Sequence, residues 1–240
     1  MSAKYKSPSF LLPNEINTNT NPLNTDGDPA TGTGINSLYS MDFDSTKKIS
    51  NITGLGLGTS VDTFSISLWF YKSNMNYAIV FSAYSGSGSY FQTGVAIELN
   101  TDGTIMFFNG TARTTTSSQY NINTWYNLVV TSDGTTVKMY VNGSQVTLDS
   151  TTAQARNFTN VWINSGAYGA SNFGITGKID EVAIFNRALD STEISALYDG
   201  TGSNIRPSNL MATNLNPLAY YPLGEQAQNK WCIARLCNGF

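Results

Sequence analysis

The sequence predicts an all-β fold of two packed antiparallel sheets, with one short helix near residues 190–199. Short segments in which apolar and polar residues alternate recur along the chain, which is the pattern of strands with one buried face. Asp-Gly or Asn-Gly pairs separate several of these segments, at 102–103, 133–134 and 142–143, and such pairs favour tight hairpin turns. Strands spaced evenly between turn signals are typical of a β-sandwich, and a sandwich of 240 residues is usually one unit.

Two N-terminal segments show the alternation most clearly. Residues 39–44 place aromatic and apolar side chains on one face and Asp42 and Asp44 on the other. Residues 63–72 divide in the same way into two sets, which are Phe64, Ile66, Leu68 and Phe70 on one face and Ser65, Ser67, Trp69 and Tyr71 on the other. The apolar set is assigned to the core between the two sheets.

The remaining predicted strands are short and continue to residue 185. They cover residues 78–83, 94–99, 104–108, 125–131, 136–141, 145–148, 161–164 and 179–185. The predicted helix follows, because Asp190 can be its N-cap and Glu193, three residues later, completes a capping box. Ile194, Leu197 and Tyr198 then form one apolar stripe, and Gly200 is the expected end of the helix.

Four sequence blocks carry a family resemblance. They are TFSISLWFYK at 63–72, NTWYNLVV at 123–130, TTVKMYVNGSQV at 135–146, and the segment 177–200 with Ile-Asp-Glu-Val, Asn-Arg-Ala-Leu and Leu-Tyr-Asp. In this order they resemble a laminin-G-like, concanavalin A-like domain over roughly residues 40–200. The resemblance implies a two-sheet antiparallel jelly-roll sandwich. It implies no single function, because this fold includes lectins, adhesins, glycosidases and inert spacers.

The N-terminal part is expected to differ from the rest of the chain. Residues 1–36 are polar and interrupted by prolines, so they have no core of their own. Two interpretations remain open for this part. It is either a flexible extension or an assembly arm in which the apolar residues 10–12 contact a neighbouring subunit. The laminin-G-like sandwich is assigned to residues 37–201.

The C-terminal part, residues 202–240, is expected to comprise a linker and one strand. Residues 219–229 are similar to the first strand of the resembled family, which normally precedes residues 39–44. Two alternatives follow from this order. The segment either returns to the first-strand position of the same sandwich, in a circularly permuted arrangement, or begins a truncated second repeat.

Composition excludes several classes of function. Only 12% of the residues are charged, and 13 lysine and arginine residues in a chain of net charge −3 cannot supply the basic surface that nucleic acid needs. No apolar run approaches the roughly 18 residues of a membrane span. The apolar core of the N-terminus, residues 10–12, is too short for a secretory signal. Cys232 and Cys237 both lie near the end of the chain, so disulfides do not hold the sandwich together.

Catalysis is not expected. The chain contains no histidine, which removes a Ser-His-Asp triad, a histidine general base and histidine-ligated metal sites. Glycosidases of the resembled family place paired carboxylates at even spacing on one face of a strand. Asp180 and Glu181 are adjacent and are therefore predicted to point to opposite faces. Glu98 stands alone between Ile97 and Leu99.

A calcium site is the next candidate, because the resemblance implies calcium at a sandwich edge, held by carboxylates and carbonyl oxygens. Asp42, Asp44 and Asp180 are its predicted ligands, with Asp102 or Asn100 as less favoured positions. In the alternative interpretation, Asp180 accepts a hydrogen bond from a neighbouring loop and the other two carboxylates face solvent. The sequence has no Asp-x-Asp-x-Asp-Gly loop, which favours this alternative slightly.

A glycan-binding platform requires aromatic rings that stack on sugar C–H faces and amides that bind hydroxyl groups. The candidate residues lie in strands and in Gly/Ser-rich loops, and they are Trp69, Tyr71, Tyr84, Tyr90, Tyr168 and Asn172. The alternative is that the tryptophans are buried structural residues. For Trp125 burial is the favoured prediction, whereas for Tyr90 and Tyr168 neither interpretation is favoured.

The predicted function is therefore non-enzymatic. The leading hypothesis is a structural or adhesive module that binds a glycan or a protein and forms part of a virion decoration, fibre or tail. Such a module would assemble into a homo-oligomer through its N-terminal arm and lie on the virion surface or outside the cell. The alternative is a carbohydrate-binding module or adhesin domain of a secreted bacterial protein. A glycosidase ranks last.

Overall fold

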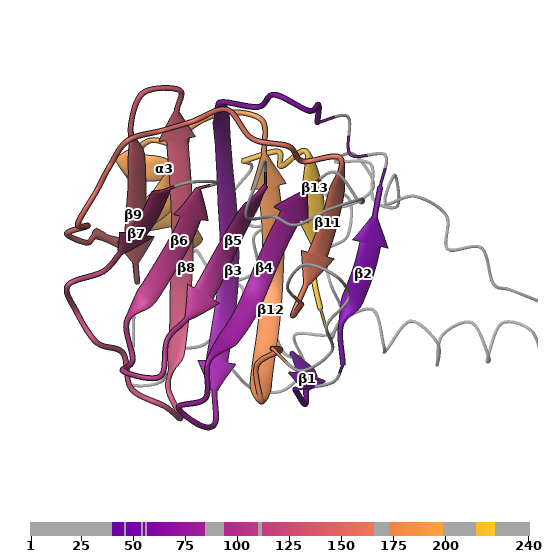
Figure 1. The fold of residues 1–240 in the computed structure, drawn as a ribbon, viewed down its shortest axis with the longest axis vertical. Helices are drawn as coiled ribbons and strands as arrows, with labels where there is room; N and C mark the ends of the chain where they lie inside the picture. The colour runs from indigo at the N-terminus through magenta and orange to yellow at the C-terminus, as the bar shows by residue number, and fades with distance from the viewer. Residues whose placement is uncertain are drawn as a thin grey trace, which may run out of the picture.

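The computed structural model describes residues 40–45, 47–53, 55, 57–84, 94–109, 112–165, 173–198 and 215–223. These residues form two antiparallel sheets packed face to face, together with one short helix (Figure 1). The predicted fold class, an all-β sandwich with a single short helix, is confirmed. The predicted arm, Tyr90, Tyr168, Asn172, Gly200 and both cysteines lie outside the described residues.

The first sheet has seven strands in the part of the chain that the structure describes. They are β1 (Met41–Phe43), β3 (Thr63–Lys72), β8 (Trp125–Asp133), β9 (Val137–Val141), β10 (Ser144–Gln145), β12 (Gly177–Phe185) and β13 (Ala219–Tyr221). Their order is β1-β12-β3-β8-β9-β10, and β13 also pairs with β12. Sequence neighbours such as β8 and β9 pair through tight turns, whereas β12 reaches β3 from more than a hundred residues away.

The second sheet has six strands within the described ranges. They are β2 (Ile49–Ile52), β4 (Ala78–Tyr84), β5 (Val95–Leu99), β6 (Ile105–Asn109), β7 (Ala112–Thr115) and β11 (Asn160–Ile163). Their order is β2-β11-β4-β5-β6-β7. No helix among the described residues is long and apolar enough to cross a membrane.

The core lies between the sheets and follows the predicted alternation. The side chains that β3 directs inward are those predicted, Phe64, Ile66, Leu68 and Phe70, and all are buried in the core cluster. Phe64 packs against Phe158 and Phe107 of other segments, with ring centroids 4.9 and 6.2 Å apart. Tilted aromatic contacts of this kind add to the stabilisation that burial of apolar surface provides.

The helix α3 (Ser191–Leu197) begins with the predicted capping box. The Oδ1 atom of Asp190 accepts hydrogen bonds from the backbone N–H groups of Thr192 and Glu193, at 2.8 and 2.9 Å. Glu193 accepts the N–H of Asp190 in return, at 3.0 Å. Ionic hydrogen bonding by Arg187 lowers the pKa of the Glu193 carboxyl, so the cap keeps its charge at neutral pH.

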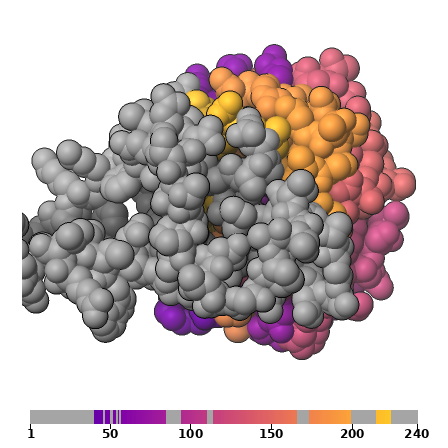
Figure 2. Space-filling view, turned by 180° about the vertical axis from the view of Figure 1, so that it is seen from behind, coloured from indigo at the N-terminus to yellow at the C-terminus, as the bar shows by residue number. Residues whose placement is uncertain are grey.

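The apolar side of α3 covers part of the outer face of the seven-stranded sheet. Ile194 and Leu197 are buried in a cluster with Val129, Ala183 and Phe185, whose side chains point away from the core. In the view from behind (Figure 2), orange atoms from the region of β12 and α3 lie next to pink atoms from the region of β8 and β9. The helix therefore shields one end of this outer face from solvent.

The C-terminal strand β13 lies in the same sheet as β12. Ala219–Tyr221 pairs antiparallel with Val182–Ile184, while β1 pairs with the other end of β12, at Gly177–Ile179. One edge of β12 is thus covered by two short strands from opposite ends of the chain. This pairing favours a strand that returns to the same sandwich over one that begins a second repeat.

A β-bulge in β12 corrects the prediction for Asp180 and Glu181. The pairing with β3 shifts between Asp180 and Ala183, and Glu181 has a positive φ of 50°. Ile179 and Val182 both belong to the core, so the two carboxylates between them lie on the outer side of the sheet. The prediction that they point to opposite faces is therefore wrong. Both are buried, Asp180 accepts the Glu181 N–H at 2.8 Å, and Glu181 accepts the Tyr220 hydroxyl.

Lys72, at the end of β3, makes stability depend on pH. Burial lowers the pKa of its ammonium group to about 8, although Asp102 raises it in part. Between pH 8 and 10.5 the unfolded chain holds a proton that the folded protein has lost, so the free energy of unfolding should rise with pH. Above pH 10 burial of Tyr221, whose pKa is raised to about 12, should reverse this trend.

We expect Lys72→Met to remove the rise between pH 8 and 10. Because the buried ammonium is only partly desolvated, the gain in stability at pH 7 should be about 1 kcal/mol. Urea unfolding of both proteins at pH 7 and pH 9.5 measures this. A wild-type free energy of unfolding that stays flat or falls over this range would contradict the proposed burial of the charge.

Candidate functional site

The structure separates the predicted glycan-binding residues. Trp69 and Tyr71 belong to the outer face of the seven-stranded sheet, because their neighbours Leu68 and Phe70 point into the core. Tyr84 lies in an apolar cluster on the outer face of the six-stranded sheet. The two groups therefore lie on opposite sides of the sandwich and do not form one platform.

Four outward-facing residues lie directly opposite one another on adjacent strands of the seven-stranded sheet. Trp125 of β8 pairs with Tyr71 of β3, Tyr71 pairs with Lys178 of β12, and Lys178 pairs with Asp42 of β1. We call these four residues the cross-strand row. Because neighbouring strands lie about 4.8 Å apart, the row is about 14 Å long. It combines two aromatic rings, one cation and one carboxylate.

The side chains of the cross-strand row contact one another and remain accessible. The rings of Tyr71 and Trp125 are 5.7 Å apart and inclined by 55°, and both are half-buried. Lys178 Nζ lies 2.5 Å from Asp42 Oδ1, and the Asp42 side chain is 74% exposed. The Tyr71 hydroxyl donates a weak hydrogen bond to Asn123 Oδ1 at 3.4 Å. An exposed ion pair of this kind adds little stability, so its groups can exchange partners readily.

Trp125 and Trp69 both differ from their predicted environments. Trp125 was expected to be buried, but it is the first residue of β8, and a strand end lacks neighbours on one side. Trp69 lies two residues before Tyr71 on β3, further from the end of the strand, and is only 1% exposed. The ring of Tyr198, which follows α3, stacks on it at 5.8 Å and 29°. The alternative interpretation, a buried tryptophan, applies to Trp69 in this structure.

The predicted calcium ligands are not brought together. Asp42 pairs with Lys178, and Asp44 accepts the Lys47 N–H at 3.0 Å and lies 3.3 Å from the Lys47 ammonium group. Asp180 is buried in the bulge of β12. Among the described residues no group of three acidic, histidine or cysteine side chains could hold a metal ion. The described residues thus give no support to a calcium site of Asp42, Asp44 and Asp180, which stays a prediction.

The less favoured calcium positions are occupied by local hydrogen bonds. Asp102 Oδ1 accepts the backbone N–H and the hydroxyl of Thr104, and these hydrogen bonds lower the pKa of the Asp102 carboxyl. The Asn100 side chain donates to the Thr104 hydroxyl at 2.9 Å. Both residues thus shape the turn between β5 and β6, and a single carboxylate in this turn falls short of the six to eight oxygen ligands of calcium.

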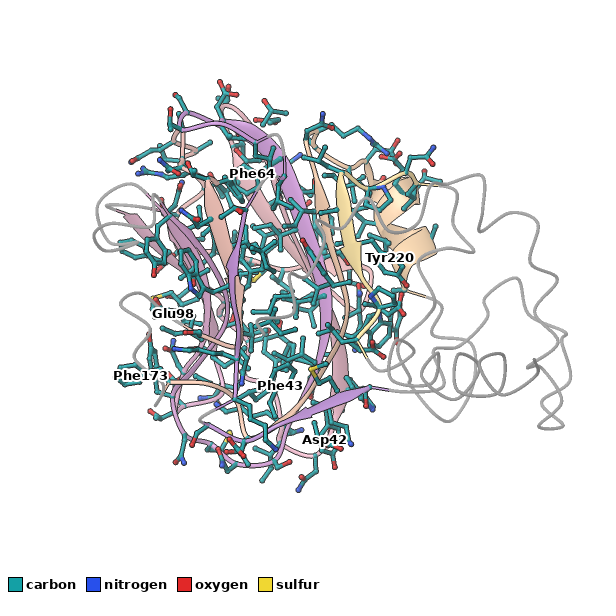
Figure 3. The ribbon with its side chains drawn as sticks, turned by 90° about the vertical axis from the view of Figure 1, so that its right-hand side faces the viewer. Asp42, Phe43, Phe64, Glu98, Phe173 and Tyr220 are labelled. Carbon is teal, nitrogen blue, oxygen red and sulfur yellow. The ribbon has the colours of Figure 1, made fainter. Side chains whose placement is uncertain are left out.

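The outer face of the six-stranded sheet carries a second group of aromatic residues. Tyr84 stacks on Trp162 with ring centroids 3.9 Å apart, and both are buried. The Tyr77 hydroxyl donates to Glu98 Oε2 at 2.5 Å, and Glu98 is also buried. Phe173, which contacts the edge of Tyr77, is 45% exposed. Figure 3 shows Glu98 and Phe173 on the side of the sandwich opposite Tyr220.

A comparison with family models matches residues 45–195, well over half of the chain, to Laminin_G_3, a model of the concanavalin A-like lectin/glucanases superfamily. The chain belongs to this superfamily. The resemblance inferred from the four sequence blocks is confirmed. No curated protein sequence matches this concanavalin A-like chain.

Solved structures similar to this concanavalin A-like chain share its fold at low identity. A proposed carbohydrate-binding protein from Bacteroides ovatus is 13% identical with a TM-score of 0.54, and the match covers 78% of this chain and 52% of that protein. Domain 4 of the extracellular arabinanase AbnA from Geobacillus stearothermophilus, solved with arabinotriose, is 16% identical with a TM-score of 0.51. This match covers 65% of this chain and 74% of that one. A heptameric SAP-like pentraxin from Limulus polyphemus is 15% identical with a TM-score of 0.46, and the match covers 75% of this chain and 93% of that one.

Two residues of the cross-strand row, Lys178 and an accessible Trp125, could not be predicted from the sequence. Trp125 begins a predicted strand and Lys178 immediately precedes one, and continuing the alternation places each on an outer face. The missing information was the register between strands that are distant in sequence. Lys178 and Tyr71 are brought opposite each other by the pairing of β12 with β3, which no local pattern encodes.

Proposed function

We propose that this chain is a non-enzymatic carbohydrate-binding module and that the cross-strand row is its ligand-contact surface. The observation that carries the proposal is the pair of adjacent, half-buried rings of Tyr71 and Trp125 beside an exposed ion pair. Sugar C–H faces stack on aromatic rings, while carboxylate, ammonium and amide groups bind sugar hydroxyls. The row offers both kinds of contact on one accessible face.

Three features support a binding rather than a catalytic role. The chain lacks histidine. The adjacent carboxylates of Asp180 and Glu181 are buried in the bulge of β12, and Glu98 is buried on the other sheet. Glycoside hydrolysis needs two carboxyl groups that flank the scissile bond about 5–10 Å apart. Asp180 and Glu181 lie on the outer face of one sheet and Glu98 on that of the other, so they do not flank a common bond, and each accepts a hydrogen bond within the protein.

The similar structures support the carbohydrate class. The protein from Bacteroides ovatus is proposed to bind carbohydrate, and the arabinanase domain was solved with an arabinose trisaccharide. Their identities of 13% and 16% transfer only the fold, so the sugar that this chain binds is left to experiment.

We further propose that the module is displayed on a virion decoration, fibre or tail and assembles through residues 1–36. The bias toward Asn, Thr and Gly and the absence of histidine support this hypothesis. The layout of arm, sandwich and C-terminal strand at 1–36, 37–201 and 202–240 belongs to the same proposal. Light scattering of residues 1–240 and 37–240 tests it, because an assembly arm predicts an oligomer that becomes a monomer on truncation. Two monomers would contradict it.

We expect Trp125→Ala to weaken glycan binding strongly. Loss of one aromatic contact should weaken binding at least tenfold, which is about 1.4 kcal/mol or more. The matched control is Phe173→Ala, which removes a 45% exposed ring from the opposite face. A glycan array followed by titration of the bound glycan measures both variants, with and without EDTA.

The array has three informative outcomes. Loss with Trp125→Ala and retention with Phe173→Ala supports the cross-strand row. The reverse pattern moves the site to the six-stranded sheet and contradicts the proposed surface. Absence of binding by the wild-type protein to any arrayed glycan contradicts the carbohydrate function itself. Binding is expected to be unchanged by EDTA, because no three acidic, histidine or cysteine side chains of the described residues form a group that could hold a metal ion.

A further inference from the structure

One buried amide next to the cross-strand row lacks hydrogen bonds. The Asn127 side chain is 0% exposed, and neither its Oδ1 nor its Nδ2 atom has a partner. Buried polar groups are nearly always paired, because an unpaired group loses its hydration without compensation. Trp125, two residues earlier on β8, points to the same face. The unpaired amide thus lies on the same outer face as Trp125, two residues further from the end of β8.

The backbone of Asn127 is fixed, so the amide cannot reach solvent by a shift of the strand. Its N–H donates to Asn142 Oδ1 at 2.9 Å, and its carbonyl accepts the Asn142 N–H, also at 2.9 Å. Asn142 lies in the turn after β9 with a positive φ of 52°. This reciprocal pair holds the strand end while leaving the Asn127 side chain without a partner.

Trp69 lies between two polar side chains on this face. It pairs with Asn127 of β8 on one side and with Asp180 of β12 on the other. Asp180 already accepts the Glu181 N–H, which fixes its carboxylate. An aromatic ring flanked by a donor–acceptor amide on one side and a carboxylate on the other is the composition of a pocket for one sugar ring.

Tyr198 covers this group. Its ring stacks on the Trp69 ring at 5.8 Å, and a Cβ added at Gly143 would lie 3.2 Å from Tyr198 Cδ1. Because Gly143 has no side chain, it leaves room for the Tyr198 ring over Trp69. Tyr198 is the C-cap of α3 with extended φ and ψ of −114° and 97°. Rotation of this one side chain would uncover Trp69 and Asn127 beside Tyr71 and Trp125.

We propose that Trp69 and Asn127 form a second, covered sugar subsite that extends the cross-strand row inward, and that Tyr198 is its movable cover. This inference rests on the proposed carbohydrate function. Its ligand is a neutral pyranose, which stacks on Trp69 and exchanges one donated and one accepted hydrogen bond with the Asn127 amide. Binding satisfies the amide that the free protein leaves unpaired, and Asp180 borders the same ring.

The test uses Asn127→Leu, which keeps the side-chain volume and removes the polar atoms. Titration of intrinsic tryptophan fluorescence with methyl glycosides of glucose, galactose, mannose and N-acetylglucosamine, and with the glycan found on the array, measures binding. Asn127→Leu should bind at least tenfold more weakly than wild type while melting at the same or a higher temperature. Tyr198→Ala should bind severalfold more tightly, and Tyr198→Phe, which keeps the ring, should match wild type.

The outcomes separate this inference from the proposed function. If Trp125→Ala loses binding while Asn127→Leu binds as wild type does, the covered subsite is wrong and the carbohydrate function stands. If Asn127→Leu melts well below wild type, the amide is a structural group and the subsite is again wrong. If wild type binds neither the methyl glycosides nor any arrayed glycan, both proposals fall together.

Discussion

Replacing Gly177 with alanine is expected to destabilise the sandwich by about 3 kcal/mol or more. Gly177 is the first residue of β12 and has a positive φ of 152°. A Cβ built there would lie 1.9 Å from the backbone oxygen of Tyr71 and 3.2 Å from the Cα of Lys72. Backbone atoms cannot move aside as a flexible side chain can, so β12 would have to separate from β3 at this end.

The matched control is Gly58→Ala, because a Cβ at Gly58 meets nothing within 4 Å. Urea unfolding should place this control within about 0.5 kcal/mol of wild type. Separation of β12 from β3 would also displace Lys178 from Tyr71, so Gly177→Ala should weaken glycan binding even where the variant remains folded. A variant as stable as the control would contradict the close approach of the two strands.

Removal of the C-terminal strand is expected to have a comparable effect. Ala219 and Leu223 are buried in the core, and the Tyr220 hydroxyl hydrogen-bonds the buried Glu181. Burial of one leucine contributes about 1.5–3 kcal/mol, and loss of a partner for a buried polar group costs about 1–3 kcal/mol. A chain that ends at residue 214 should therefore lose at least about 3 kcal/mol.

A chain that ends at residue 223 is the control, because it keeps β13 and loses only the residues after it. Urea unfolding of both truncations against the full chain measures the contribution of the strand. Equal stability of the two truncations would show that β13 is dispensable, and would favour the alternative in which this segment belongs to a second repeat.

Much of the fold could be predicted because its signals are local. The alternation in β3 assigns Phe64 and Phe70 to the core, where the structure places them. The capping box of Asp190 and Glu193 predicts the start of α3. Each of these features depends on residues within a few positions of one another, so a single sequence contains the information.

The bulge in β12 could not be predicted from the alternation. A strict period of two places Asp180 and Glu181 on opposite faces, but one extra residue opposite Leu68 puts Glu181 on the outer face together with Asp180. Glu181 adopts a positive φ that side-chain-bearing residues rarely adopt. Tertiary contacts, including the Tyr220 hydroxyl from β13, accompany this conformation.

The site was predicted less well than the fold, because sites depend on which strands pair. Tyr71 and Tyr84 belong to consecutive strands, β3 and β4, yet these strands lie in different sheets. The sequence gives no sign of this change of sheet, so residues of both outer faces were grouped together. Asp42 and Asp44 were grouped by sequence proximity, whereas each carboxylate pairs with its own lysine.

The most direct test of the carbohydrate-binding face is an NMR titration with the glycan found on the array, which follows the indole N–H resonances of the tryptophans. Trp125 lies in the cross-strand row, and Trp162 is buried on the opposite outer face. The account predicts that the Trp125 resonance shifts in proportion to occupancy while the Trp162 resonance stays in place. A shift of Trp162 with an unchanged Trp125, or no shift of either, would contradict it.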